Sequence, residues 1–126
     1  MVIGAAASIS KDPNSRLTCA PWAGTLGGMK ECILDIESNI HTGKPVVVSL
    51  RTPEGAVELL HVKYSKLDTL LRLLHQKDVI FAGHYISYDF ACLSENIEEL
   101  RLPIWQLYQD NRVSDTYVRE KLLRCA

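Results

Sequence analysis

The sequence lacks an excess of charge of either sign. Its 126 residues carry 14 lysines and arginines against 15 aspartates and glutamates, a net charge of −1 at pH 7. This balance excludes bulk electrostatic attraction to nucleic acid, so any such binding has to be local, through metal ions or a small basic patch. The length allows one domain, and the 47% hydrophobic and 23% charged residues are typical of a globular protein rather than a disordered or membrane protein.

Paired cysteines are also missing. Cys19, Cys32, Cys92 and Cys125 form no C-x-x-C pair and have no histidine at metal-ligand spacing. Cys32 and Cys92 lie in apolar patterns, where a free cysteine packs as a small core residue. We therefore expect a reduced, cytoplasmic protein.

Residues 1–28 contain little charge and no periodic pattern. Lys11, Asp12 and Arg16 are their only charged side chains, among many Ala, Gly, Ser and Pro residues. The apolar opening lacks the positive region of a secretory signal and is too short to span a bilayer, so no membrane partner is expected. We interpret residues 1–28 as a flexible N-terminal extension, with Met29 as the hypothetical natural start, and residues 29–126 as the folded domain.

Strand and helix patterns alternate from residue 29 onward. Apolar and β-branched runs predict three strands, over residues 31–38, 44–52 and 56–62. The loops between them are short and include a turn at 53–55, so the three strands should form an antiparallel meander.

The second half of the chain predicts helices between further strands. A helix is expected over 64–76, with Leu67, Leu70, Leu71 and Leu74 on one face, and a buried strand over 78–83. Next come a helix over 87–100 with Phe90, Leu93, Ile97 and Leu100 on one face, a strand over 112–118 and a terminal helix over 117–123. The order βββαβαβα predicts an α/β domain with a mixed sheet.

Two carboxylates stand near the end of the first strand. Asp35 and Glu37 are two residues apart, so they point to the same face, about 6 to 7 Å apart along the strand. Like charges held this close repel unless a cation lies between them, and carboxylates are the ligands that Mg²⁺ and Mn²⁺ prefer. The simpler interpretation of an isolated pair is a solvated strand end.

A second acidic position follows the buried strand at 78–83. The segment "VIFAGHYISYDFACL" passes from that strand through a Gly-His turn into a helix, whose first turn carries Asp89 beside Tyr88. The helix dipole alone would favour a carboxylate there. The combination of D-x-E with a later G-H-x-x-x-[FY]-D is rarer than either part.

These two segments carry a family resemblance. "ILDIES" resembles the first motif, and "GHYISYDFACL" the second, of the DEDD 3′–5′ exonucleases, nearest in pattern to the proofreading domain of phage-type family A DNA polymerases. The second motif of that family commonly reads G-H-N-x-x-F-D, and here Tyr85 replaces the Asn. "VSDTYVREKLL" resembles a following D-T-x-x-x-x-x-L-L segment, with Asp115 and Thr116 at its start. The resemblance covers residues 31–126.

The resemblance implies a fold and a mechanism. The fold is ribonuclease H-like, a mixed sheet of three antiparallel strands and then parallel strands, flanked by helices. The activity is two-metal hydrolysis of phosphodiester bonds at DNA 3′ ends, with two Mg²⁺ or Mn²⁺ ions. Asp35 would bridge both ions, Glu37 would bind the ion that activates water, and Asp89 would hold the second ion.

The resemblance also implies partners. The substrate would be a single-stranded DNA 3′ end, a polymerase domain would follow C-terminally, and the cell would be bacterial or phage-infected. The substrate-binding residues would be Ser38, Asn39, His84, Tyr85 and Tyr88.

The third motif of the family, Y-x-x-x-D or H-x-x-x-x-D on a later helix, has no counterpart in the right order. "YSKLD" (64–68) and "HYISYD" (84–89) match these patterns but come too early, and we interpret them as chance matches. The expectation is a partial exonuclease domain that lacks the last metal carboxylate and has little or no activity alone. Asp115 is either a fourth ligand or, more commonly for such a residue, a helix cap.

Two alternatives remain open from the sequence. One is an RNA-directed DEDD exonuclease on the same fold. The other is a non-catalytic ribonuclease H-like module that binds nucleic acid or another partner, in line with the absent third motif and with Tyr85.

Overall fold

The structure is a computed structural model of the chain, and it describes residues 28–125. The chain separates into two units, Met1–Lys30 and Glu31–Ala126. The first described strand begins at Lys30, at the boundary between them. The interpretation of residues 1–28 as an extension falls, apart from Gly28, outside the described part.

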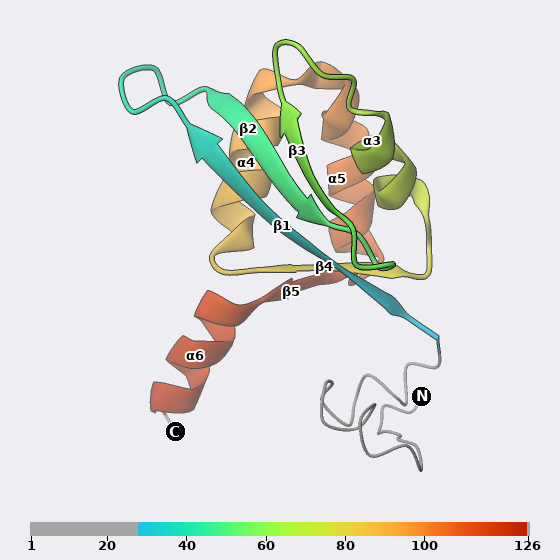
Figure 1. Ribbon diagram of the computed structural model, residues 1–126. Coiled ribbons are helices and arrows are strands. Elements are labelled where there is room, and N and C mark those ends of the chain that lie inside the picture. The colour runs from blue at the N-terminus through green and yellow to red at the C-terminus, as the bar shows by residue number, and fades with distance from the viewer. Residues whose placement is uncertain (1–27, 126) are drawn as a thin grey trace. The chain divides into compact units, whose positions relative to one another are not determined.

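The first three strands form the predicted antiparallel meander (Figure 1). They are β1 (Lys30–Ser38), β2 (Pro45–Arg51) and β3 (Val57–His61). β1 pairs with β2, and β2 with β3, both antiparallel. The predicted turn between β2 and β3 is confirmed: the Gly55 amide donates to the Thr52 carbonyl at 2.8 Å, and Gly55 has a φ of +96°. Glycine adopts this left-handed conformation without a steric penalty.

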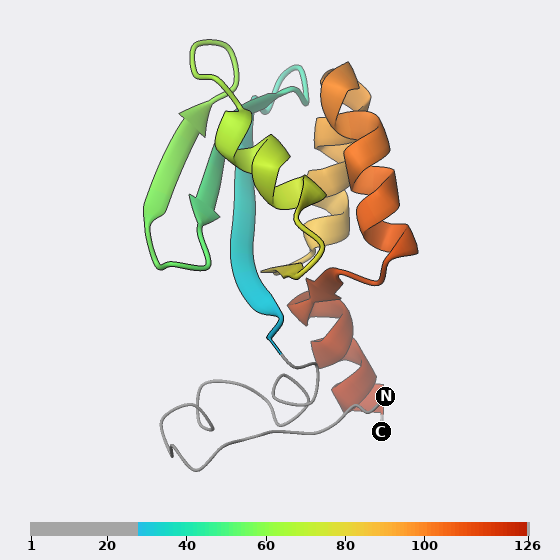
Figure 2. The same ribbon diagram turned by 90° about the vertical axis from the view of Figure 1, so that its right-hand side faces the viewer.

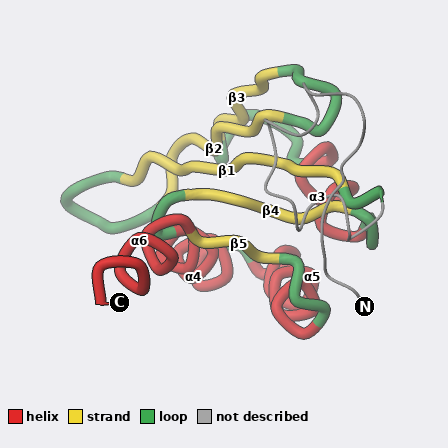
Figure 3. The backbone as a smooth tube through the Cα atoms, turned by 90° about the horizontal axis from the view of Figure 1, so that it is seen from below, coloured by secondary structure: helices red, strands yellow, loops and turns green. Residues whose placement is uncertain are grey.

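Two further strands complete a five-stranded mixed sheet. They are β4 (Val79–Gly83) and β5 (Val113–Asp115), and the strand order is β3-β2-β1-β4-β5. β4 and β5 are parallel, with Gly83 opposite Asp115, and Figure 3 shows β1 running in the same direction as β4. The C-terminal ends of β1, β4 and β5 therefore meet at one edge of the sheet.

Three helices cover one face of the sheet, and a fourth follows β5 (Figure 2). The covering helices are α3 (Asp68–His75), α4 (Ile86–Asn96) and α5 (Glu98–Gln109), and the last helix is α6 (Thr116–Cys125). Cys32, Leu34 and Ile36 of β1 are buried, whereas the residues between them are exposed, because strand side chains alternate between faces. The core comprises side chains from β1 to β4 and from α3 to α5: Cys32, Leu34, Ile36, Val48, Leu50, Leu60, Leu70, Leu73, Leu74, Val79, Phe81, Ile86, Phe90, Cys92, Leu93, Leu100, Ile104 and Leu107.

The prediction of one helix over 87–100 is wrong. The backbone becomes extended at Ile97, with φ −130° and ψ 103°, so that α4 ends at Asn96 and α5 begins at Glu98. The Asn96 side chain donates to the Cys92 carbonyl at 2.8 Å, a bond within the last turn of α4. α5 was missed because it contains Pro103, although buried Leu100, Ile104 and Leu107 follow helical spacing.

The predicted helix over 64–76 is shorter than expected. Residues 64 and 65 instead form turns in which both backbone amides donate to the His61 carbonyl, and α3 begins only at Asp68. The buried face of α3 consists of Leu70, Leu73 and Leu74, while Leu67 and Leu71 are half-buried. Leu70 and Leu74 of the predicted face are therefore buried, and Leu73 is buried beside them.

Arg112, just before β5, is the largest fully buried side chain, with 2% of its surface exposed. Its guanidinium donates to the backbone carbonyls of Leu73, Leu74 and Gln76 at the end of α3, and Nε donates to the Val79 carbonyl at 2.8 Å. Burial lowers the pKa of Arg112. One side chain thus satisfies the carbonyl groups that the end of α3 leaves without partners within the helix.

Within residues 28–125, no helix is both long and apolar enough to cross a membrane.

Candidate active site

β1 presents two carboxylates on the face of the sheet opposite the core. Asp35 and Glu37 are both exposed, and they alternate with buried Leu34 and Ile36. The pairing with β2 shifts register between Glu37 and Ser38, where the strand ends. The pleat of β1 therefore directs both carboxylates to the opposite side of the strand from Leu34 and Ile36.

Asp89, in the first turn of α4, is buried against β1, with 6% of its surface exposed. The Ile36 backbone amide and the Asp35 carboxyl group both influence the pKa of Asp89, so Asp89 lies near the C-terminal half of β1. Its Oδ2 atom has no hydrogen-bond partner. Two acidic positions that are distant in the sequence thus meet at the C-terminal edge of the sheet.

The pKa of Asp89 is raised from its ordinary value of 3.8 to about 7. Burial is the largest cause, and the negative charge of Asp35 is the second. A hydrogen bond with the Ile36 amide acts in the opposite direction, while a side-chain hydrogen bond with Asp35 and the charge of Asp115 raise the pKa further. The pocket around Asp89 therefore favours a neutral carboxyl group, or a carboxylate with a cation beside it.

Asp115, at the end of β5, joins two segments of the chain. Its Oδ1 accepts hydrogen bonds from the backbone amides of Tyr85 and Tyr117, both at 2.9 Å, and from that of Val118 at 3.4 Å. Its Oδ2 is buried without a partner. The bonds to Tyr117 and Val118 make Asp115 the cap of α6, which is the role that the sequence favoured over that of a fourth ligand.

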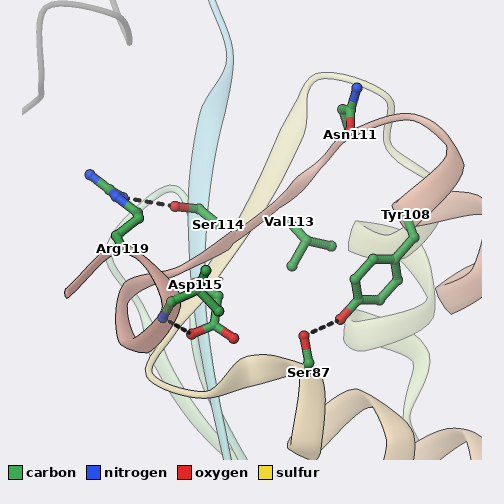
Figure 4. Close-up of a pocket in the computed structure, with 8 residues that line it drawn as sticks. Ser87, Tyr108, Asn111, Val113, Ser114, Asp115 and Arg119 are labelled. Atoms are coloured by element: carbon green, nitrogen blue, oxygen red, sulfur yellow. Dashed lines mark hydrogen bonds between the residues drawn. The ribbon is translucent and has the colours of Figure 1, made fainter. Parts of the chain in front are cut away.

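Asp115 also lines a shallow pocket of about 330 Å³ between α4, α5, β5 and α6 (Figure 4). On one wall the Tyr108 hydroxyl bonds to the Ser87 hydroxyl at 3.1 Å, and on another Arg119 donates to Ser114 Oγ at 2.9 Å. One of these hydrogen bonds connects α5 to α4, and the other connects α6 to β5, so both stabilise the residues that line the pocket.

The turn between β4 and α4 is closely packed and unusually shaped. A Cβ atom on Gly83 would lie 2.6 Å from the Leu34 carbonyl oxygen, so only glycine fits beside β1. Tyr85 adopts the left-handed conformation, with φ 58° and ψ 40°, which non-glycine residues rarely adopt. His84 Nδ1 lies 3.1 Å from Thr116 Oγ1. The turn is therefore held to the start of α6 by both His84 and Tyr85.

The structure places the remaining candidate residues in two groups. Tyr88 lies on the exposed side of α4, next to Tyr85. Ser38 is half-buried at the end of β1, and Asn39 Oδ1 accepts bonds from the amides of His41 and Thr42 within its own loop. His84, Tyr85 and Tyr88 thus share the β4–α4 junction with Asp89, whereas Asn39 stabilises the β1–β2 loop.

The carboxylate oxygens of this site are the type of ligand that a hard cation such as Mg²⁺ prefers. The Asp35 carboxyl group lies near enough to Asp89 to raise its pKa, and Asp89 Oδ2 is a buried oxygen without a hydrogen-bond partner. In the part of the chain that the structure describes, however, no three His, Cys, Asp or Glu side chains are grouped so that they could hold a metal ion as they stand. The site therefore offers two carboxylates for a metal, with Glu37 on the same strand face.

Comparison of the chain with protein-family models, curated proteins and solved structures gave no match.

The raised pKa of Asp89 predicts how stability depends on pH without metal. The folded state holds the Asp89 proton up to about pH 7, whereas the unfolded chain releases it near pH 4. The stability that this proton contributes is complete below pH 4 and is lost as the pH rises through 7. Relative to the wild type, Asp89→Asn should therefore gain stability progressively between about pH 4 and about pH 7.

Urea denaturation in EDTA at a series of pH values measures this difference. Glu54→Gln, in the exposed turn between β2 and β3, is the matched control and should follow the wild type at every pH. A stability difference between Asp89→Asn and the wild type that is constant across this range would contradict the prediction.

Proposed function

We propose that the chain provides part of the catalytic domain of a metal-dependent 3′–5′ exonuclease with a ribonuclease H-like fold, without its last metal carboxylate, in the proofreading domain of a phage-type family A DNA polymerase. The reaction would be hydrolysis of phosphodiester bonds at DNA 3′ ends. The observation that carries the proposal is that Asp35 and Asp89, one from each of the two motifs, lie close enough for the charge of Asp35 to raise the pKa of buried Asp89.

The sheet supports the same proposal. It has three antiparallel strands followed by parallel ones, as the resemblance implies, in the order β3-β2-β1-β4-β5. Asp35 and Asp89 lie toward the C-terminal edge of this sheet, the edge at which ligands bind in open α/β sheets.

The residues present would contribute as follows. Asp35 and Asp89 would hold divalent metal, with Glu37 as a further ligand, and Mg²⁺ or Mn²⁺ bound there would supply charge stabilisation and an activated water. Asp89 holds its proton in the metal-free protein below about pH 7, so metal binding has to displace that proton. His84, Tyr85 and Tyr88 surround the approach to Asp89 and would bind the DNA end together with Ser38 and Asn39.

A second candidate is a non-catalytic nucleic-acid-binding module on the same fold. It is favoured by the lack of a three-residue metal group within residues 28–125 and by Tyr85 in place of the usual Asn. The two candidates differ in whether a metal-dependent hydrolysis accompanies binding.

Hydrolysis of 5′-labelled single-stranded DNA and RNA of the same sequence tests the proposal, with the full gene product that contains residues 28–125. We expect DNA to be shortened from its 3′ end one nucleotide at a time with Mg²⁺ or Mn²⁺, and not with EDTA. Faster shortening of RNA would identify the RNA-directed alternative. No shortening of either strand, with oligonucleotide binding retained, would overturn the exonuclease and favour the binding module.

A further inference from the structure

Four aromatic rings lie together at the junction between β4 and α4 and at the start of α6. The Tyr85 and Tyr88 rings are stacked, with centroids 5.8 Å apart and planes inclined by 14°. The Tyr117 ring lies 4.9 Å from that of Tyr85 and 5.4 Å from that of His84. Tyr85 joins the two sides, since its ring contacts both Tyr88 and Tyr117.

These rings are exposed rather than part of the core. Tyr85 and Tyr88 have 51% and 52% of their surface exposed, and Tyr117 is half-buried. Large aromatic side chains in water normally gain by burial, so an ordered exposed cluster is informative. Packing between the rings therefore leaves part of their aromatic surface open to solvent.

The backbone holds the cluster in place. Asp115 Oδ1 accepts bonds from the backbone amides of both Tyr85 and Tyr117. One carboxylate oxygen therefore fixes the two residues that lie on different segments, and it fixes Tyr85 in its left-handed conformation. A surface organised before its ligand arrives loses less entropy on binding.

Positive charge lies next to the rings on α6. Lys121 Nζ is 5.3 Å from the centroid of the Tyr117 ring. Arg119, Lys121 and Arg124 give this helix three basic side chains against one acidic side chain, Glu120, although the whole chain has a net charge of −1. Arg124 forms an ion pair with Glu120 at 3.0 Å, so Lys121 is the cation that lies beside the rings and supplies the local positive charge that binding of nucleic acid requires.

We propose that Tyr85, Tyr88 and Tyr117 form a stacking platform for the bases of single-stranded nucleic acid, and that Lys121 contacts the phosphate backbone there. Stacked aromatic rings beside a cation are the surface that binds single strands without sequence preference. The inference rests on the proposed function in one respect, namely that the platform would lead the strand to Asp89. We favour a nucleic acid over a protein as the occupant because a lysine on the adjoining helix lies beside the rings, and because the stacked rings of Tyr85 and Tyr88 are half exposed to solvent.

Fluorescence anisotropy of a labelled oligothymidylate in EDTA tests the platform without hydrolysis. Tyr117→Leu and Tyr85→Leu should each weaken binding by about tenfold, the effect of losing one stacked base. Tyr117→Phe and Tyr85→Phe should bind as the wild type does, because stacking needs the ring and not the hydroxyl. Trp105→Leu, which removes an exposed ring on α5, is the matched control and should leave binding unchanged.

Two further measurements separate the bases from the backbone. An abasic oligonucleotide should bind the wild type and Tyr117→Leu equally, since it has no bases to stack. Lys121→Gln should reduce the slope of the logarithm of affinity against the logarithm of salt concentration by about 0.7, the value for one phosphate contact on a single strand. Tyr117→Leu should leave that slope unchanged.

The outcomes distinguish this inference from the proposed function. Weaker binding in the leucine variants, with no hydrolysis by the gene product, would support the platform and defeat the exonuclease. Hydrolysis with unaltered binding in the leucine variants would defeat the platform alone. Absence of oligonucleotide binding in EDTA, or leucine variants that change only the oligomeric state, would overturn the platform and identify the rings as a protein interface.

Discussion

Asp35→Asn is expected to abolish the response of the protein to Mn²⁺. The substitution keeps the size of the side chain but removes the charge that lies near the Asp89 carboxyl group. We expect the affinity for Mn²⁺ to fall by about 100-fold or more, since loss of even an outer-shell partner typically costs about 10- to 100-fold. Paramagnetic broadening of the backbone amide signal of Ile36, whose amide bonds to Asp89, reports directly on the site.

The same variant has an expected effect without metal. The charge of Asp35 is the second-largest cause of the raised Asp89 pKa, so Asp35→Asn should lower that pKa, while burial keeps it above its ordinary value of 3.8. Carbon-13 NMR of the carboxyl groups in EDTA measures this shift. This second measurement shows whether the two side chains interact even in a sample that binds no metal.

Glu31→Gln is the matched control for Asp35→Asn. Glu31 lies on the same strand and the same exposed face, two alternations before Asp35. Its replacement removes one negative charge at a distance from Asp89 and should leave Mn²⁺ broadening of Ile36 unchanged. Equal Mn²⁺ affinity in the wild type and Asp35→Asn would defeat the assignment of the metal site.

Arg112→Met is expected to lower the free energy of unfolding by about 3 to 5 kcal/mol. Methionine fills much of the volume, but it removes the donors that Arg112 supplies to the carbonyl groups of Leu74 and Val79. The carbonyl groups of Leu73 and Gln76 also lose Arg112 but keep the backbone amides of Gln76 and Val79 as donors. Each buried polar group without a partner costs about 1 to 3 kcal/mol. Since small domains have only about 5 to 15 kcal/mol of stability, the variant should have a much lower urea midpoint.

Lys77→Met provides the control for the loss of charge. Lys77 Nζ lies 2.8 Å from Asp110 Oδ2, but the lysine side chain is 68% exposed, so solvent screens this ion pair and its loss should change stability far less than the loss of Arg112. Arg112→Lys keeps the positive charge and loses the planar set of donors, so its stability should fall between those of the wild type and Arg112→Met. An Arg112→Met protein within about 1 kcal/mol of the wild type would show that the carbonyl groups find other donors.

The strands and the direction of the acidic pair followed from local pattern. Alternation in β1 buries Cys32, Leu34 and Ile36 and exposes Asp35 and Glu37, because the period of a strand is two residues whatever surrounds it. The proximity of Asp35 and Asp89 depends on the order of the strands, with β4 next to β1, and only the family resemblance predicts it from the sequence.

The remaining features depend on contacts between distant segments. The sequence around Arg112 does not show that its guanidinium donates to backbone carbonyl groups at the end of α3. Those of Leu74 and Gln76 lie more than thirty residues away along the chain. The bond from Tyr85 to Asp115 likewise exists only because β4 and β5 are parallel with Gly83 opposite Asp115. Pro103 concealed α5 since proline usually marks a helix boundary rather than an interior.

The attachment of α6 has a consequence for motion. α6 buries no side chain, and its first turn is held by hydrogen bonds, from the Tyr117 amide to Asp115 and from Thr116 Oγ1 to the Gly83 carbonyl. A segment with so little apolar contact opens at a lower free energy than the core does. When α6 opens, Tyr117 leaves Tyr85 while Asp89 keeps its place on α4, so the aromatic surface can assemble and disassemble without disturbing the acidic site.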